Sequence, residues 1–304
     1  MSRPAANELG GLSRKTRAAW LSIVANAALI VFKVVVGLIS GSIGIISEAL
    51  HSGTDLAAAA IALVSVREAA RPADLRHRYG HEKVENLSAL IEGAIIFAAA
   101  IVIIVEAVVH LVQGEQLDHL WLGIVVMLVS AAVNGASAAY IYGTARRTAS
   151  PALEADAAHH LTDVYTSLGV AGGLLLAQLT GLTFFDPLLA IAVALLIIWT
   201  AWGIVSPSTR VLLDEALPDD ELDLVRETVA EHRGELIIGY HKLRARHAGA
   251  RHLIDLHVTV PGNMTVMRAH EIAEHIESDI AERLPNTEVL VHIEPSTHER
   301  EDES

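Results

Sequence analysis

Long runs of aliphatic residues, separated by short polar segments, fill the first two thirds of the chain. A helix needs about 20 apolar residues to cross the hydrocarbon core of a bilayer. Six runs approach or exceed this length, at residues 18–39, 43–66, 86–112, 120–142, 153–179 and 187–206. The pattern therefore predicts an α-helical membrane domain of six transmembrane helices at residues 18–207. Residues 1–17 form a polar tail without the apolar core and cleavage site of a signal peptide.

Beyond residue 207 the pattern changes to that of a soluble domain. The segment DDELDLVRETVAEHR starts with acidic residues and is amphipathic, which predicts a helix. LIIGYHKLRARHAG and RHLIDLHVTVPG alternate apolar and polar residues, as half-buried strands do. A helical segment, MTVMRAHEIAEHIESDIAERL, and a last strand, TEVLVHIEP, follow. We predict a two-layer α+β domain with the order αββαβ at residues 208–295, and a polar tail at residues 296–304.

Basic residues lie on one side of the predicted spans. The links SGSI, GEQLDH and TGLTFFD contain no Lys or Arg. The opposite flanks are basic, at Arg14, Lys15, Arg17, Arg67, Arg71, Arg76, Arg78, Lys83, Arg146, Arg147 and Arg210. Because basic flanks mark the cytoplasmic side of a membrane protein, we expect both termini and the C-terminal domain in the cytoplasm.

Composition narrows the chemistry that the chain can perform. Hydrophobic residues make up 52% of its 304 residues, and the mean hydropathy is +0.42. The net charge is −14, with most of the excess acid after residue 208, which argues against nucleic acid as a partner. The absence of cysteine excludes disulfides, thiolate metal sites and cysteine catalysis. Any metal site must therefore use Asp, Glu and the 16 histidines.

Two of the predicted spans carry a histidine and an aspartate four residues apart. His51 and Asp55 lie in the second span, and His159 and Asp163 lie in the fifth. Residues at this spacing share a helix face, and ionisable residues in hydrocarbon are costly unless they pair or line a cavity. Two such helices would supply two imidazoles and two carboxylates, which suit a tetrahedral divalent metal such as Zn²⁺. Buried His–Asp hydrogen bonds between helices are the simpler alternative, but they do not explain why both helices carry both residue types.

These motifs resemble the cation diffusion facilitator family of metal/proton antiporters. NAALIVFKVVVGLISGSIGIISEALHSGTDL is similar to the family's first and second spans, and DPLLAIAVALLI is similar to its sixth span. RPADLRHRYGHEKVENLSALIEG resembles the loop between its second and third spans. The C-terminal segment resembles its cytoplasmic domain, which is ferredoxin-like or metallochaperone-like. The resemblance covers residues from about 17 to 295, and it implies a homodimer formed through the cytoplasmic domain.

The resemblance implies a transport site made of the residues His51, Asp55, His159 and Asp163. His160 competes with His159 for the imidazole position, but it lies three residues from Asp163 rather than four, so we expect it to be a neighbour. Family members with two His and two Asp at this site are mostly zinc transporters. Imidazole also favours Zn²⁺, Co²⁺ and Ni²⁺ over Mg²⁺ or Mn²⁺. Zn²⁺ is our first expectation, and Co²⁺, Cd²⁺, Fe²⁺ and Ni²⁺ remain alternatives.

Ligand chemistry suggests how transport is driven. Metal ligands must be deprotonated, so protons and metal compete for the same atoms, and histidine titrates in the physiological range. A site that binds metal from a neutral cytoplasm and meets an acidic exterior would exchange metal for protons by alternating access. The chain has no GxxxxGK[ST] segment for ATP. We expect an efflux antiporter in the inner membrane of a bacterium.

Two further metal sites follow from the resemblance, with Zn²⁺ in a regulatory or structural role. Asp74, His77 and His81 match a loop site in some family members, although a solvated charged loop is the simpler explanation. A set in the C-terminal domain matches the family's zinc site near the dimer interface: His241, His257, His270, His292 and Glu294, the last of which is often Asp in the family. The remaining histidines of that domain and of the polar tail are expected to be ordinary surface residues: His232, His247, His252, His275 and His298.

The resemblance also implies a charge interlock between Lys83, at the start of the third span, and Asp214, after the sixth.

Two other functional classes fit the sequence less well. An intramembrane zinc enzyme would need an open water position and a general base, yet four protein ligands leave no such position and no HExxH segment occurs. A membrane-anchored metal sensor would not require His51 and Asp55 within a span. We therefore expect a transporter rather than an enzyme.

Overall fold

The structure is a computed structural model that describes residues 4–40, 43–113, 120–180, 184–232 and 237–296. Some side chains inside these ranges, including that of His51, lie outside the described part. The chain divides into two compact units, Met1–Thr209 and Arg210–Ser304. Each unit is described by itself below.

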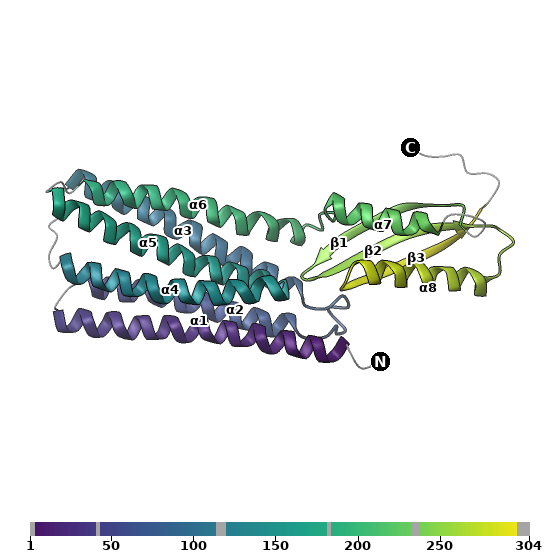
Figure 1. The fold of residues 1–304 in the computed structure, drawn as a ribbon, viewed down its shortest axis with the longest axis horizontal. Coiled ribbons are helices and arrows are strands. Elements are labelled where there is room, and N and C mark those ends of the chain that lie inside the picture. The colour runs from purple at the N-terminus through teal and green to yellow at the C-terminus, as the bar shows by residue number, and fades with distance from the viewer. Residues whose placement is uncertain (1–3, 41–42, 114–119, 181–183, 233–236, 297–304) are drawn as a thin grey trace. The chain divides into compact units, whose positions relative to one another are not determined.

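The first unit contains long helices that correspond to the six apolar runs. They are α1 (Pro4–Ser40), α2 (Ile43–Ala69), α3 (Lys83–Gln113), α4 (Leu120–Thr148), α5 (Pro151–Thr180) and α6 (Phe185–Leu212). Figure 1 shows them side by side in a bundle. α1 begins at Pro4, so most of the segment predicted as a polar tail is helical. Proline suits the first position of a helix because its missing N–H would have no partner there.

The bundle exposes apolar side chains on its surface and buries a set of polar side chains in its interior. Val31, Leu38, Ile39 and Val112 are all strongly exposed on its surface. Its buried interior holds many alanines and serines, together with ionisable side chains. Such an arrangement suits lipid as the surrounding solvent, because apolar side chains face the hydrocarbon while small residues let the helices approach closely.

Four helical segments in the described part of the chain are long and apolar enough to cross a membrane. They are Leu12–Ile39, Lys83–Val112, Trp121–Thr148 and Pro187–Leu212. They fall in α1, α3, α4 and α6, whereas α2 and α5 carry the residues of the expected transport site. The count of six spans therefore stays a prediction.

The second unit has the predicted αββαβ order. Its elements are α7 (Asp219–Glu231), β1 (Gly239–Ala248), β2 (Arg251–Val260), α8 (Val266–Arg283) and β3 (Thr287–Pro295). The strands form a mixed sheet in the order β1-β2-β3, in which β1 and β2 are antiparallel and β2 and β3 are parallel.

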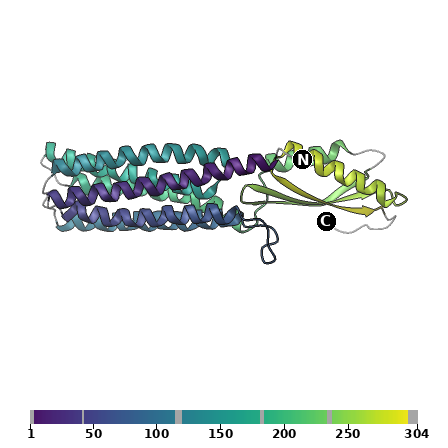
Figure 2. The same cartoon turned by 90° about the horizontal axis from the view of Figure 1, so that it is seen from below.

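The two faces of this sheet differ. Alternate residues of β2 (Ile254, Leu256, Val258 and Val260) are buried in one core with the apolar residues of α7 and α8. Figure 2 shows both helices on the same face of the sheet. His257 belongs to the opposite set of β2 residues, and the register places it directly across from His241 on β1 and His292 on β3. This face, which α7 and α8 leave uncovered, therefore gathers histidines from all three strands.

Candidate metal centre

The bundle brings together three of the four residues expected to hold the transported metal. α2 supplies Asp55, and α5 supplies His159 and Asp163; one ligand atom from each lies within 4.8 Å of the others. His159 Nε2 is 3.1 Å from Asp55 Oδ1, and both residues are 5% exposed. The side chain of His51 lies outside the described part, so its role as the fourth ligand stays a prediction.

The dimensions of this group suit a small divalent cation. Tetrahedral Zn²⁺ with bonds of about 2.0–2.1 Å holds its ligand atoms about 3.3–3.4 Å apart. The 3.1 Å separation of His159 Nε2 and Asp55 Oδ1 is close to that value. The same Nε2 atom can either carry a proton toward Asp55 or donate its lone pair to a metal, and it cannot do both. Metal and proton therefore compete at one atom of the site.

His160 faces a different part of the bundle from His159. Its Nε2 is 2.9 Å from Ser22 Oγ of α1, and its Nδ1 is 2.9 Å from Asn134 Oδ1 of α4. Ser22 also donates a hydrogen bond of 2.8 Å to Asp156 Oδ1 on α5. His160, Ser22 and Asp156 have no exposed surface, and Asn134 is 3% exposed. This network was not predicted from the sequence. Isolated polar residues inside apolar runs were the feature of the sequence that could have indicated it.

The loop before α3 gathers its three expected ligands. Asp74 lies 3.4 Å from both His77 Nδ1 and His81 Nε2, and the two imidazole rings are 4.5 Å apart. Asp74 Oδ1 accepts hydrogen bonds from the backbone N–H groups of His77, at 2.6 Å, and Arg76, at 2.7 Å. These bonds lower the pKa of the Asp74 carboxyl, so this ligand is ionised at neutral pH.

The uncovered face of the sheet gathers a second expected set. Glu294 Oε1 lies 2.8 Å from His257 Nδ1 and 3.8 Å from His292 Nε2, and Glu294 Oε2 lies 3.1 Å from His241 Nε2. The hydrogen bond with His257 is the main cause that lowers the pKa of the Glu294 carboxyl. A carboxylate surrounded by three imidazoles is a donor set that suits Zn²⁺.

Two expected contributions stay predictions. His270 lies on α8, where its Nε2 is 3.4 Å from Glu274 Oε1. Asp214 Oδ1 accepts a hydrogen bond of 2.7 Å from Arg246 Nη1. Because Lys83 and Asp214 belong to different units, the interlock between them stays a prediction, as does a ligand role for His270.

Both units match one family of transporters. Residues 19–213 match the profile described as "Cation efflux transmembrane domain", and residues 217–296 match the profile described as "Cation efflux protein, cytoplasmic domain". The chain belongs to the cation diffusion facilitator family. Membership confirms the sequence-based identification, and it makes the protein an integral membrane transporter with a cytoplasmic domain rather than an enzyme.

Curated relatives of this cation diffusion facilitator match over most of their length. The uncharacterized transporter sll1263 of Synechocystis sp. is 38% identical over 275 residues, which cover 90% of this chain and 88% of the relative. The cation-efflux pump FieF of Klebsiella pneumoniae is 31% identical over 287 residues, which cover 93% of each chain. These relatives are bacterial, in line with the expected location in a bacterial inner membrane.

Solved structures match the C-terminal part of the chain. The metal-bound C-terminal domain of the CzcD transporter from Thermotoga maritima is 27% identical, covers 25% of this chain and 87% of its own, and has a TM-score of 0.24.

Proposed function

We propose that this transporter exports a divalent cation, with Zn²⁺ as its first cargo, in exchange for protons. The cargo site consists of Asp55, His159 and Asp163, with His51 completing it from the preceding turn of α2. The single observation that carries the proposal is the cluster of one imidazole and two carboxylates, which α2 and α5 hold inside an apolar bundle. Carboxylates buried at this depth are costly unless a cation balances them.

Proton coupling rests on the competition at His159. In the absence of metal, the group formed by His159 Nε2 and Asp55 Oδ1 can hold a proton between them. Arrival of Zn²⁺ requires that proton to leave, because the metal takes the lone pair that the proton occupies. A site that opens alternately to the two sides of the membrane would therefore carry metal one way and protons the other.

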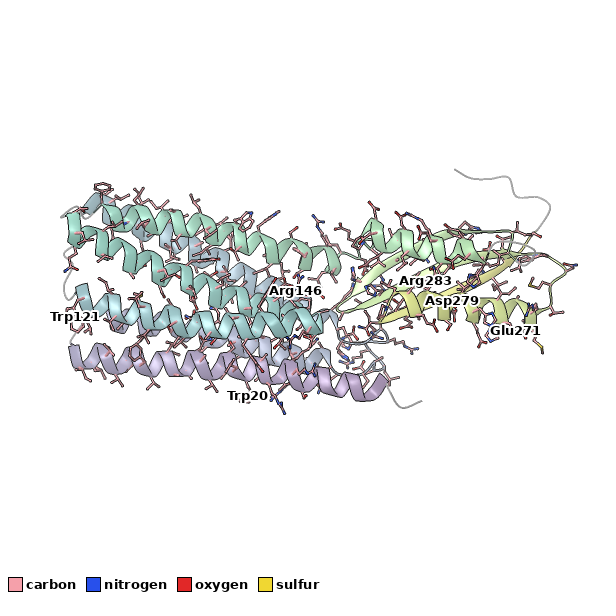
Figure 3. All side chains as sticks on the ribbon, viewed as in Figure 1. Trp20, Trp121, Arg146, Glu271, Asp279 and Arg283 are labelled. Atoms are coloured by element: carbon pink, nitrogen blue, oxygen red, sulfur yellow. The ribbon has the colours of Figure 1, made fainter. Side chains whose placement is uncertain are left out.

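Six spans with both termini inside form the second part of the proposal. α2 has 27 residues and α5 has 30, which is enough to cross a bilayer core. Figure 3 shows Trp121 at one end of the bundle and Arg146 toward the other. The guanidinium of Arg67 lies over the ring of Trp20, 5.8 Å from its centroid. Paired basic and aromatic residues at one level are typical of a membrane–water interface.

The choice of cargo rests on donor chemistry. One or two imidazoles with two carboxylates favour borderline metals, so Zn²⁺, Co²⁺, Ni²⁺ and Cd²⁺ are all compatible, as is Fe²⁺. We place Zn²⁺ first because it accepts a four-coordinate site without a geometric penalty. The related FieF is named a cation-efflux pump, a name that leaves the metal open.

The cytoplasmic domain supplies the rest of the proposal. We propose that it forms a homodimer and that Zn²⁺ binds at His241, His257, His292 and Glu294 as a structural or regulatory ion. His270 and the Lys83–Asp214 interlock would act in the assembled dimer. The loop site at Asp74, His77 and His81 has three ligands, so it would bind metal weakly.

Reconstituted proteoliposomes test the cargo site. With a pH gradient imposed, wild-type protein should move Zn²⁺, and flux should collapse when the gradient is removed. Asp55→Asn and His159→Ala should each abolish this flux. Glu106→Gln, which neutralises an exposed carboxylate on α3, is the matched control and should transport normally. Zinc flux at wild-type rate in Asp55→Asn would refute the assignment.

A further inference from the structure

A further cluster of metal-ligating side chains lies in the cytoplasmic domain, on the face of the sheet that the helices cover. It consists of Glu221 from the first turn of α7, His247 near the end of β1 and His252 near the start of β2. One ligand atom of each lies within 4.8 Å of the others, and all three residues are partly buried. From the sequence, both histidines were expected to be ordinary surface residues.

The strand register explains why these side chains meet. His247 and His252 are directly opposite each other in the antiparallel pair, so their side chains share a face, and their ring centroids are 4.9 Å apart. A bulge between His241 and Arg244 shifts the alternation of β1. His241 therefore lies on the uncovered face beside His257, whereas His247 lies on the face covered by α7.

Glu221, on α7, is the third member of the cluster. Its Oε2 atom lies 3.9 Å from His247 Nε2 and 3.7 Å from His252 Nε2. Within the described part of the chain, this buried oxygen has no hydrogen-bond partner. A buried carboxylate oxygen without a donor is unfavourable, and a bound cation would remove that cost.

Each imidazole has a feature that favours metal binding at Nε2. Thr287 Oγ1 lies 3.4 Å from His252 Nδ1, which leaves Nε2 directed at Glu221. Burial and the neighbouring His252 lower the pKa of His247, so its ring is neutral at neutral pH. A neutral imidazole is the form that binds metal.

We propose that Glu221, His247 and His252 form a divalent-metal site, distinct from the sets on the uncovered face and in the loop. Tetrahedral Zn²⁺ would place the ligand atoms about 3.3–3.4 Å apart. The observed 3.7 and 3.9 Å separations require the side chains to close by about half an ångström. With three protein ligands, water would take the fourth position.

The site would link the start of α7 to the β1–β2 hairpin. The connecting segment between α6 and α7 already contacts this hairpin, through the Asp214–Arg246 ion pair of 2.7 Å and a backbone hydrogen bond of 3.3 Å from Leu217 N to Ala245 O. Metal binding at Glu221 would add a third link at the same end of the sheet. Cytoplasmic metal would thereby stiffen the segment through which the membrane domain continues into the cytoplasmic domain.

The test uses the full chain in detergent with Zn²⁺ as the probe. A background variant removes the other candidate ligand sets through Asp55→Asn, Asp74→Ala, His241→Ala and His257→Ala. Isothermal titration calorimetry of this variant should still detect one Zn²⁺ per chain. A background variant that binds no Zn²⁺ while its circular dichroism is unchanged would overturn the proposal.

Single substitutions then locate the remaining ion. Adding His252→Ala to the background variant should reduce Zn²⁺ affinity at least tenfold, and so should Glu221→Gln, which preserves the shape of the side chain. Adding His275→Ala, an exposed histidine on α8, is the matched control and should leave binding unchanged. Zn²⁺ binding that persists in both His252→Ala and Glu221→Gln would refute the site. In the wild-type chain, Zn²⁺ should also slow hydrogen exchange in the first turn of α7, and Glu221→Gln should remove this effect.

Discussion

Replacing His160 by alanine separates a packing role from a ligand role in the fifth helix. His159 and His160 are adjacent, yet they have different partners. His159 lies 3.1 Å from Asp55, whereas His160 contacts Ser22 and Asn134. We expect His160→Ala to weaken the bundle and to leave transport by the folded fraction intact. His159→Ala should abolish transport and leave the stability of the bundle largely intact.

The expected size of the effect follows from the two contacts that are lost. Both are 2.9 Å long, and both partners are almost wholly buried. A buried polar atom left without a partner costs about 1–3 kcal/mol. Ser22 keeps its hydrogen bond to Asp156, so the cost of removing the partner of Ser22 should lie near the lower end of that range. The free energy of unfolding should therefore drop by about 2–4 kcal/mol, before any cost of the cavity.

The assay combines unfolding in a denaturing detergent with zinc flux normalised to folded protein. A double-mutant cycle with Asn134→Ala provides the control. If the two side chains are partners, the double variant should be less destabilised than the sum of the single variants, by about 0.5–3 kcal/mol. Two outcomes would refute the reasoning: wild-type stability in His160→Ala, or loss of zinc flux in His160→Ala with flux retained in His159→Ala.

Three further predictions concern packing and charge. Gly169→Leu should separate α5 from α6 and reduce transport, because even a Cβ at Gly169 would lie 2.7 Å from a methyl carbon of Val193 on α6. Gly143→Ala is the control: a Cβ at Gly143 would have nothing within 4 Å, so this variant should be neutral in the same flux assay. Glu85→Gln should lower the unfolding free energy of the bundle by about 1–3 kcal/mol, since the buried Glu85 carboxylate accepts a 2.6 Å charged hydrogen bond from α1. The Arg283 guanidinium holds the pKa of the Glu231 carboxyl below its usual value, so this pair stabilises the cytoplasmic domain above about pH 4.3 and loses its effect as the pH falls through the lowered pKa. Urea unfolding at pH 7 and at pH 3 should therefore show a smaller difference in Glu231→Gln than in the wild type.

Much of the fold could be predicted from hydrophobic periodicity. Six apolar runs correspond to α1–α6, and alternating residues gave the αββαβ order of the second unit. Both signals are local, so a single sequence contains them. The start of α1 at Pro4 was not predicted, because the polar residues there suggested a tail although many of them are compatible with a helix.

The interior of the bundle was only partly predictable. The spacing of His159 and Asp163 predicted that both lie on one face of α5, and in the structure this face lies against Asp55 of α2. Which helix faces His160 depends on how α1 and α4 are rotated about their axes. Tertiary packing sets that rotation, and no local pattern in the sequence reports it.

Strand register explains why the cluster of Glu221, His247 and His252 was not predicted. His247 and His252 were expected to be ordinary surface residues of an acidic domain, and alternation alone does not show where β1 changes phase. The bulge between His241 and Arg244 sets that phase, and it exists only in the paired strands. Glu221 comes from α7 rather than from the sheet, so its place beside the two histidines depends on the packing of α7 on the sheet.

Locating the metal itself tests the central proposal most directly. Crystals of the full-length protein soaked in Zn²⁺ should be measured at the zinc absorption edge. We predict an anomalous peak about 2.0–2.2 Å from His159 Nε2 and from carboxylate oxygens of Asp55 and Asp163. Absence of a peak at this position, in protein that still exports Zn²⁺ after reconstitution, would contradict the proposal.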